Sequence, residues 1–240
     1  MLRGRQRYKT HAGIPHGSTN ALGSGLAFYL QWKTGVAVGQ WDDQSVNGNN
    51  ATQATSGDQA ALSGGGLDFE QGEGDHYDFD SQVAISTQEG FVFWLMCNIE
   101  STSGNMTVLG LNATTHFLEF QSGTHSIRTR LGSSTVTVTP GDGSRGDFDK
   151  ESKFLFTLQR EAGGTGNINL WKNGVLLPQD EQTANTGDGE FISLGVRNND
   201  RHFDGVMYDV AMVESGAARD IHIERINAHL CAKHGISQTL

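Results

Sequence analysis

The chain has 240 residues, enough for one large β-sandwich, and its 18% charged and 36% hydrophobic residues exclude a disordered chain. The net charge is −10, yet residues 1–20 contain four basic residues and no acidic one. No run of residues approaches the ~18 consecutive apolar residues of a membrane helix, so we expect neither a membrane span nor a membrane partner.

Residues 1–20 show no periodicity, so we expect an extended arm in front of a folded domain at residues 21–240. A basic arm on an acidic body indicates docking on an acidic partner. The contacts would come from Arg3, Arg5, Arg7, Tyr8 and Lys9. A solvated, frayed terminus is the alternative interpretation. The arm lacks the apolar stretch of a secretory signal, so we expect a protein that stays in the cytoplasm where it is made.

Short β-like runs follow one another along the rest of the chain. They cover residues 26–32, 66–70, 76–80, 91–99, 106–111, 117–120, 126–131, 135–139, 154–160, 167–172, 191–196 and 206–213. The run Phe91–Ile99 is the most apolar and predicts a central strand buried on both faces. The run Ser126–Leu131 alternates, which is typical of a strand with one face in water. Asn173-Gly174 predicts a two-residue hairpin, because both residue types tolerate positive φ.

Only the end of the chain has a helical pattern, over residues 217–234. Ile223, Ile226 and Leu230 share one helix face, which we expect to pack on the sandwich. Because no strand–helix alternation occurs, the pattern predicts an all-β, two-sheet antiparallel sandwich with an extended N-terminal arm and one C-terminal helix.

Three stretches resemble the laminin-G-like branch of the concanavalin-type jelly rolls. They are Gly39–Gln53 (GQWDDQSVNGNNATQ), Asn167–Val175 (NINLWKNGV) and Phe203–Ile236, which is similar to the family's last strand and closing helix. The chain departs from the pattern at Val46, where Gly is common, and at His229 and His234, where Tyr is usual. The resemblance implies a jelly-roll sandwich of the single-copy type found in bacterial and tailed-phage structural proteins. It says little about function, because the fold hosts many functions.

Glycosidases of this fold resemble one another in a strand bearing Glu-x-Asp-x-(x)-Glu, which sets two carboxylates at the separation of retaining catalysis. No such motif occurs, and Glu119 stands alone in its run. The acidic residues between Asp68 and Asp80 indicate a solvated edge. We therefore expect no enzymatic activity.

Some laminin-G-like domains bind calcium, and hard oxygen ligands are present at Asp142, Asp147 and Asp149. Ordinary turn chemistry is the alternative there, and we expect no other metal or cofactor. Sugars stack on exposed aromatic rings. Trp171 is the remaining candidate for such a contact, because Trp94 belongs to the apolar run and the other tryptophans lie in family framework positions.

The leading hypothesis is a non-catalytic virion protein, a capsid decoration protein of a tailed phage that docks through its arm. Its partners would be the major capsid protein or other virion subunits, with a homo-oligomer on the particle left open, and its place would be the virion assembled in the host cytoplasm. The steps to the virion and to its capsid rest on analogy. The alternative is a carbohydrate-binding module of a tail or receptor-binding assembly, and the second alternative is a glycoside hydrolase. Nucleic acid is not expected as a partner, because the acidic body repels phosphates.

Overall fold

The computed structural model describes residues 25–87, 89–101, 103–111, 113–122, 126–139, 148, 152–163, 166–178, 184–214 and 220–238. The predicted arm at residues 1–20 lies outside them. None of the helices in this described part has the length and hydropathy of a membrane span.

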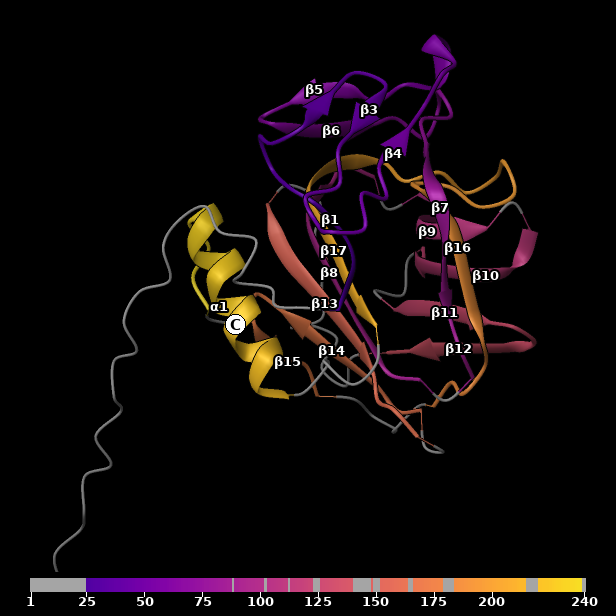
Figure 1. Ribbon diagram of the computed structural model, residues 1–240, viewed down its shortest axis with the longest axis vertical. Coiled ribbons are helices and arrows are strands. Elements are labelled where there is room, and N and C mark those ends of the chain that lie inside the picture. Colours follow the sequence, from indigo (N-terminus) through magenta and orange to yellow (C-terminus); the bar gives the residue numbers. More distant parts are fainter. Residues whose placement is uncertain are drawn as a thin grey trace, which may run out of the picture.

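Two antiparallel sheets lie face to face (Figure 1). The helix-side sheet contains β1 (Leu26–Leu30), β5 (Ala61–Ser63), β6 (Gly66–Phe69), β8 (Phe91–Ile99), β13 (Phe154–Arg160), β14 (Ile168–Lys172), β15 (Val175–Leu176) and β17 (Gly205–Glu214). The open-face sheet contains β2 (Val36–Ala37), β3 (Gln40–Trp41), β4 (Ala51–Thr52), β7 (Tyr77–Ile85), β9 (Met106–Leu111), β10 (Ala113–Phe120), β11 (Ile127–Leu131), β12 (Ser134–Val138) and β16 (Gly189–Leu194). Together with the helix α1 (Asp220–His234), this arrangement confirms the predicted all-β sandwich with one C-terminal helix.

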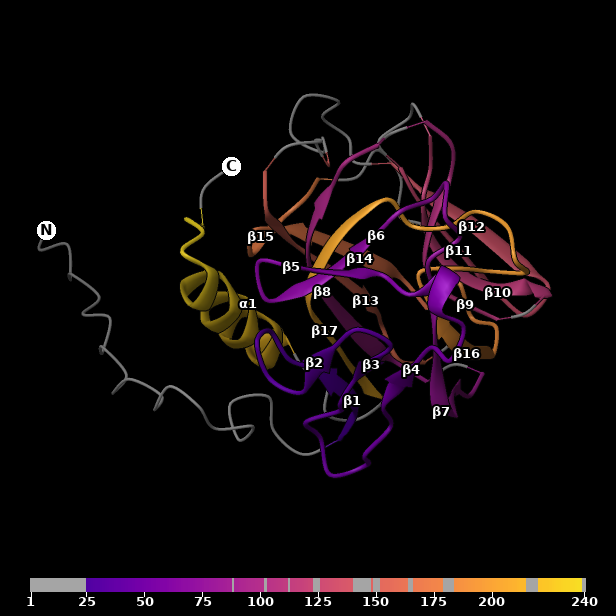
Figure 2. The ribbon, with the colours of Figure 1, turned by 90° about the horizontal axis from the view of Figure 1, so that it is seen from above.

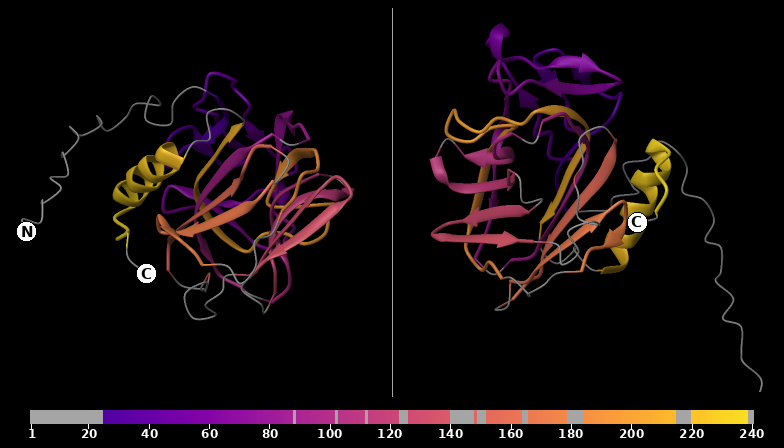
Figure 3. Two further views of the ribbon diagram at one scale, coloured as in Figure 1. Left: turned by 90° about the horizontal axis from the view of Figure 1, so that it is seen from below. Right: turned by 180° about the vertical axis from the view of Figure 1, so that it is seen from behind.

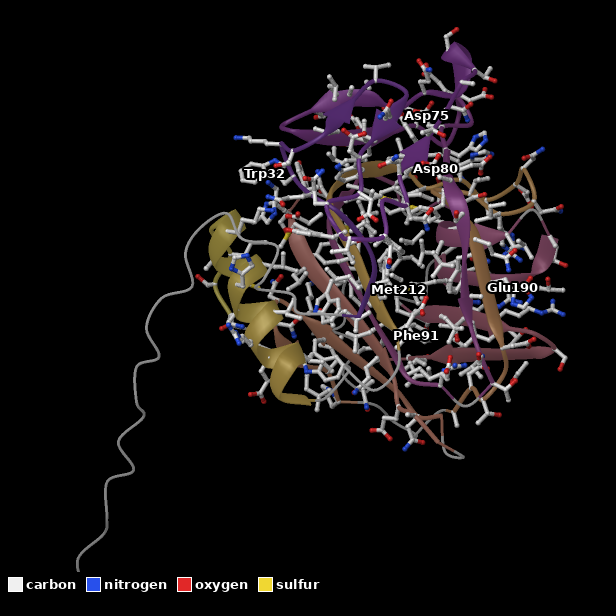
Figure 4. The ribbon with its side chains drawn as sticks, viewed as in Figure 1. Trp32, Asp75, Asp80, Phe91, Glu190 and Met212 are labelled. Atoms are coloured by element: carbon white, nitrogen blue, oxygen red, sulfur yellow. The ribbon has the colours of Figure 1, made fainter. Side chains whose placement is uncertain are left out.

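The helix-side sheet separates two apolar layers. Phe93 and Leu95 of β8 face the core between the two sheets, whereas Trp94 on the same strand faces α1. In Figure 4, Phe91 and Met212 lie between the sheets, and Glu190 lies on the outer side of the open-face sheet. A strand covered on both faces can be apolar at every position. The prediction that Phe91–Ile99 is a central, doubly buried strand is therefore confirmed.

The helix α1 is fixed to the outer side of the helix-side sheet, opposite strands β9–β12 (Figure 2). Ile223, Ile226 and Leu230 are buried there, as the sequence predicts. The buried Asn227 accepts hydrogen bonds from Trp94 Nε1 at 3.0 Å and from Thr157 Oγ1 at 2.8 Å. These bonds pair two strand donors that would otherwise be buried without an acceptor. The helix ends at the predicted residue, His234, and residues 217–219 of its predicted start lie outside the described residues.

A buried carboxylate holds the last turn of α1. Asp209 of β17 accepts hydrogen bonds from Lys233 Nζ at 2.8 and 3.0 Å, and it also contacts His234 Nε2. Burial alone raises the pKa of Asp209, but the hydrogen bond to His234 and the charge of Lys233 outweigh it, so the net shift is downward. This is a tight, structural ion pair.

The turn between β14 and β15 has the predicted hairpin geometry, with φ of 50° at Asn173 and 79° at Gly174. The cysteines are free and buried in different layers: Cys97 lies in the core between the sheets, and Cys231 of α1 lies in the layer between the helix and the sheet.

Candidate functional site

The two sheets differ in how their outer faces are covered. Every residue of β13 and nearly every residue of β8 and β17 is buried, because α1 covers the outer face of their sheet. In contrast, β7 and β12 alternate buried and exposed positions. Figure 3 shows α1 on one side of the sandwich only. The outer face of the open-face sheet is thus the broad sheet surface that α1 leaves open to solvent.

Three arginines converge on one buried glutamate on this open face. The Glu119 side chain is fully buried, and its Oε1 accepts hydrogen bonds from Arg128 Nη1 at 3.2 Å and Arg201 Nη1 at 3.5 Å. Arg197 Nε lies 3.1 Å from Glu119 Oε2, and Asn105 Nδ2 donates to Oε1 at 3.3 Å. We call Glu119, Arg128, Arg197 and Arg201 the arginine cluster.

Strand register brings Glu119 and Arg128 together. Leu118 and Phe120 face the core between the sheets, so Glu119 between them faces outward. Glu119 is directly opposite Arg128 of β11 and opposite Thr107 of β9. The carboxylate therefore lies within reach of side chains from both neighbouring strands.

Arg197 and Arg201 come from the connection between β16 and β17. Gly110 of β9 lets this connection approach, because a Cβ there would lie 2.1 Å from the Val196 carbonyl oxygen. Asn198, Asn199 and Arg201 have left-handed backbone with φ of 50°, 50° and 59°. Such backbone is uncommon outside glycine and is costliest at Arg201, because asparagine tolerates it better.

An aromatic ring lies beneath two of the guanidinium groups. Phe117 is fully buried, and it shares the outward face of β10 with Glu119. Arg197 Cζ lies 3.9 Å and Arg128 Cζ 5.2 Å from the centre of the ring. Cation–π stacking restricts both guanidinium planes before any ligand arrives.

Burial dominates the electrostatics of the cluster. Burial raises the pKa of Glu119, although Arg197, Arg201 and Arg128 all act to lower it. Burial likewise lowers the pKa of Arg197, against the attraction of Glu119. Three guanidinium groups face one buried carboxylate, and the other nearby acid, Asp200, is 74% exposed at 3.7 Å from Arg201. The cluster keeps an excess of positive charge.

The polar atoms of the cluster are incompletely paired. Its ion pairs span 3.1–3.5 Å, longer than the ~2.7–2.9 Å of strong charge-assisted hydrogen bonds. By comparison, the ion pair between Lys233 Nζ and Asp209 Oδ1 is 2.8 Å long. Thr107 Oγ1 is buried without a hydrogen-bond partner in the described part of the chain, and the 3.1 Å contact between Arg197 Nε and Glu119 Oε2 lacks hydrogen-bond geometry. Buried polar atoms usually have a partner, so this site has unused bonding capacity.

A second group of charged residues lies on the outer side of the helix-side sheet. Asp68, Glu70 and Glu100 bring carboxylate oxygens within 4.8 Å of one another. Burial, followed by the neighbouring carboxylates, raises the pKa of all three groups. Oxygen ligands of this kind suit calcium, but exposed acidic clusters are also common without an ion. The nearby Asp75 is buried, so the prediction of a solvated edge is wrong there: its carboxylate accepts the Glu70 backbone N–H at 2.8 Å.

An aromatic surface next to that acidic group is already covered by cations. Trp32 lies beside the end of α1 (Figure 4), with its ring centre 4.6 Å from that of His234. Lys153 Nζ lies 3.7 Å from the centre of the Tyr208 ring, and Lys33 Nζ lies 4.2 Å from that of Trp32. Because these lysines contact the rings, the rings are less available to stack on a sugar than exposed aromatic side chains would be.

A cavity of about 200 Å³ lies near the end of β17, lined by Ala27, Asn47, Asn49, Ser81, Gln82, Val83 and Glu214. Its amides are largely used by the fold. Asn47 Nδ2 donates to the Leu26 carbonyl at 2.6 Å, and Asn49 exchanges two hydrogen bonds with the backbone of Ser81. The cavity therefore offers fewer free groups to a ligand than the arginine cluster does.

The site residues predicted from the sequence do not come together in the structure. Those of the arm (Arg3, Arg5, Arg7, Tyr8 and Lys9) and the calcium candidates (Asp142, Asp147 and Asp149) lie outside the described residues. Trp171 lies on the outer face of the helix-side sheet, half-buried against the layer under α1. Its contact with a sugar stays a prediction. Sequence reasoning noted Glu119 only as a lone acid and missed the arginine cluster.

Comparisons with known proteins place the fold among β-sandwich domains. No protein-family model matches the sequence, and no curated protein matches it. Domain 4 of AbnA, a GH43 extracellular arabinanase from Geobacillus stearothermophilus, in complex with arabinotriose, is similar in structure with a TM-score of 0.54 and 15% identity. The match covers 80% of this chain and 93% of that domain.

Two larger proteins contain a similar unit. Trypanosoma rangeli sialidase matches with a TM-score of 0.56 and 14% identity over 89% of this chain, which spans 34% of the sialidase. The botulinum neurotoxin serotype D ligand binding domain, in complex with N-acetylneuraminic acid, matches with a TM-score of 0.52 and 17% identity over 87% of this chain, which spans 52% of that domain. At these identities the likeness shows the fold alone, a jelly-roll-like β-sandwich.

Proposed function

We propose that this chain is a non-catalytic carbohydrate-binding module that takes a glycan on the outer face of its open-face sheet. The arginine cluster carries the proposal, because it places two partly exposed guanidinium groups, held by a weakly bonded buried carboxylate, on the sheet face that α1 leaves open. The likeness to a domain in complex with arabinotriose supports it, since that domain matches over nearly its whole length. We also propose that the sandwich belongs to the laminin-G-like branch of the jelly rolls, as the sequence resemblance implies.

The chemistry of the cluster fits oligosaccharide recognition. Sugar sites need a few placed polar groups that fix the orientation of the ligand. Arg128 and Arg201 expose 28% and 34% of their side chains, so their remaining N–H groups are open to a ligand. The ring of Phe117 limits the movement of Arg128, which lowers the entropy lost on binding.

The two other functions predicted from the sequence have no comparable site among the described residues. Docking on a capsid depends on residues 1–20, which lie outside the described residues, so it stays a prediction. Most glycoside hydrolases use two cooperating carboxylates. Asp68, Glu70 and Glu100 are the closely spaced set within the described ranges, and they lie on the opposite sheet from the arginine cluster.

A glycan array probed with the full-length protein tests this function, followed by isothermal titration with the best ligand. We expect saturable binding of at least one oligosaccharide class and no new reducing ends after prolonged incubation. Substituting Arg201→Gln should weaken that binding, because it removes a partly exposed donor. An array without any saturable ligand would contradict glycan binding, and release of reducing ends would contradict the non-catalytic assignment.

A further inference from the structure

We propose that the glycan recognised by this chain is acidic, and that Arg128 and Arg201 bind a carboxylate or sulfate group of the sugar beside Glu119. This inference rests on the proposed glycan-binding function and names the ligand class for the same site. It follows from three properties of the arginine cluster: its donor content, its charge and its incomplete pairing.

The cluster donates hydrogen bonds but has little capacity left to accept them. A guanidinium group has five N–H donors and no acceptor. Glu119 Oε1 already accepts from Arg128, Arg201 and Asn105, at 3.2, 3.5 and 3.3 Å, and its buried Oε2 is paired with Arg197 Nε at 3.1 Å. A neutral sugar hydroxyl both donates and accepts, so it would leave its own donor poorly paired here. Carboxylate and sulfate groups only accept, which matches what the cluster offers.

The charges point to the same ligand class. Arg128, Arg197 and Arg201 face a single buried carboxylate, so one further anionic group would bring the cluster closer to neutrality. The chain as a whole has a net charge of −10, so its wider field does not attract anions. Binding of an acidic glycan would therefore depend on this local excess of positive charge.

The cluster is arranged before the ligand binds. Arg197 is nearly buried at 6% side-chain exposure and stacks on Phe117 at 3.9 Å, so it acts as a fixed charge below the surface. Arg128 and Arg201 lie at the surface on either side, one on β11 and one on the connection between β16 and β17. Two guanidinium forks at one position match the two-oxygen geometry of a carboxylate or the three oxygens of a sulfate ester.

The buried Thr107 supports the view that the site is incomplete. Its side chain lies opposite Glu119, and its Oγ1 has no partner among the described residues although it is fully buried. A buried hydroxyl without a partner is destabilising. Glu119, opposite Thr107, holds Arg197 Nε in an ion pair that lacks hydrogen-bond geometry, so the incompletely bonded groups lie on one small area of the open face.

The ligand panel is chosen to separate charge from sugar. One arm uses an oligogalacturonate and its methyl ester, which share a backbone and differ in the carboxylate charge. A second arm uses a sulfated and an unsulfated galactan oligomer. A third arm uses acetate and inorganic sulfate, which report on binding of the bare anion. Affinities are measured by isothermal titration at low and at physiological salt.

The protein variants separate the cluster from general charge effects. Arg201→Gln and Arg128→Gln each remove one surface guanidinium, and Arg128→Lys keeps the charge but loses the fork. The matched control is Arg225→Gln, which removes the same charge from an exposed position of α1 on the opposite sheet. Melting curves of each variant establish that it is folded.

We expect an acidic oligomer to bind at least about tenfold more tightly than its neutral counterpart, and each Gln variant to lose about tenfold in affinity. Arg225→Gln should bind like the parent protein. Equal binding of acidic and neutral oligomers, or an acidic preference unchanged in both Gln variants, would overturn this inference while glycan binding stands. Absence of binding to every oligomer of the panel and of the glycan array, acidic and neutral, would instead remove the proposed function itself.

Discussion

Glu119 is the resident anion of the arginine cluster, and its charge competes with that of an acidic ligand bound beside it to the same arginines. Arg128, Arg197, Arg201 and Asn105 contact its carboxylate. Removing one partner of a buried ion pair is usually costly, because it leaves the other charge uncompensated. Glu119 therefore stabilises the buried Arg197. A glutamate that is loosely held leaves its arginines able to bind a second anion.

The protonation of Glu119 predicts a pH dependence of binding. Burial raises the pKa of this carboxyl group, so acidification protonates it before an ordinary glutamate. Protonation removes the negative charge that competes with the ligand. The arginines around it stay charged, and the exposed Asp200 beside Arg201 is the other acid close to the cluster. Affinity for a sulfated oligomer, which stays ionised, should therefore rise as the pH falls from about 7 to about 5.

Isothermal titration across that range measures the effect. Glu119→Gln should remove most of the pH dependence and bind the sulfated oligomer more tightly at neutral pH, since the competing charge is gone. A parent protein with the same affinity throughout the range would contradict the competition between Glu119 and the ligand.

At the scale of elements, α1 turns a half-exposed sheet into a fully buried one. Ile226 and Leu230 are nearly inaccessible, at 2% and 0% exposure, and pack on the layer that contains Trp94 and Leu155. Truncating either residue to Ala should cost about 2–5 kcal/mol of unfolding free energy, through lost burial and the cavity left behind. Urea denaturation measures this cost, with Glu224→Ala on the exposed side of α1 as the control. Costs below about 0.5 kcal/mol, as at surface positions, would mean that α1 does not pack as described.

The longer elements could be predicted from the sequence because their patterns are long enough to read. The apolar run of β8 and the spacing of Ile223, Ile226 and Leu230 each reflect burial on known faces. The strands β2, β3 and β4 have two residues each, too few to show any periodicity, and were not predicted. They form only because β7 offers a free edge for β4 to pair with.

The candidate site could not be predicted for a different reason. The alternation of Arg128 within β11 showed that its side chain faces outward. Its partnership with Glu119, however, depends on the register between β10 and β11. Arg197 and Arg201 arrive from a connection far along the chain, and Gly110 gives no sequence signal that it makes room for them. Contacts of this kind follow from tertiary structure rather than from local patterns.

The whole molecule has two unlike outer faces. One face holds α1, with the acidic group of Asp68, Glu70 and Glu100 on the same sheet beyond it. The other face holds the arginine cluster on strands without a helical cover. In a chain with a net charge of −10, the arginine cluster is a local excess of positive charge to which an acidic glycan would bind.

The most direct test of this account is to map the ligand on the protein by nuclear magnetic resonance. An acidic oligosaccharide is titrated into ¹⁵N-labelled protein while the arginine Nε–H and tryptophan indole N–H signals are followed. The account predicts saturable shifts at Arg128 and Arg201, with smaller ones at Arg197, and an unchanged signal from Trp171. Shifts confined to the indoles of Trp171 and Trp32, with the arginine signals unmoved, would place the ligand on the outer face of the helix-side sheet. That result would contradict the arginine cluster as the binding site.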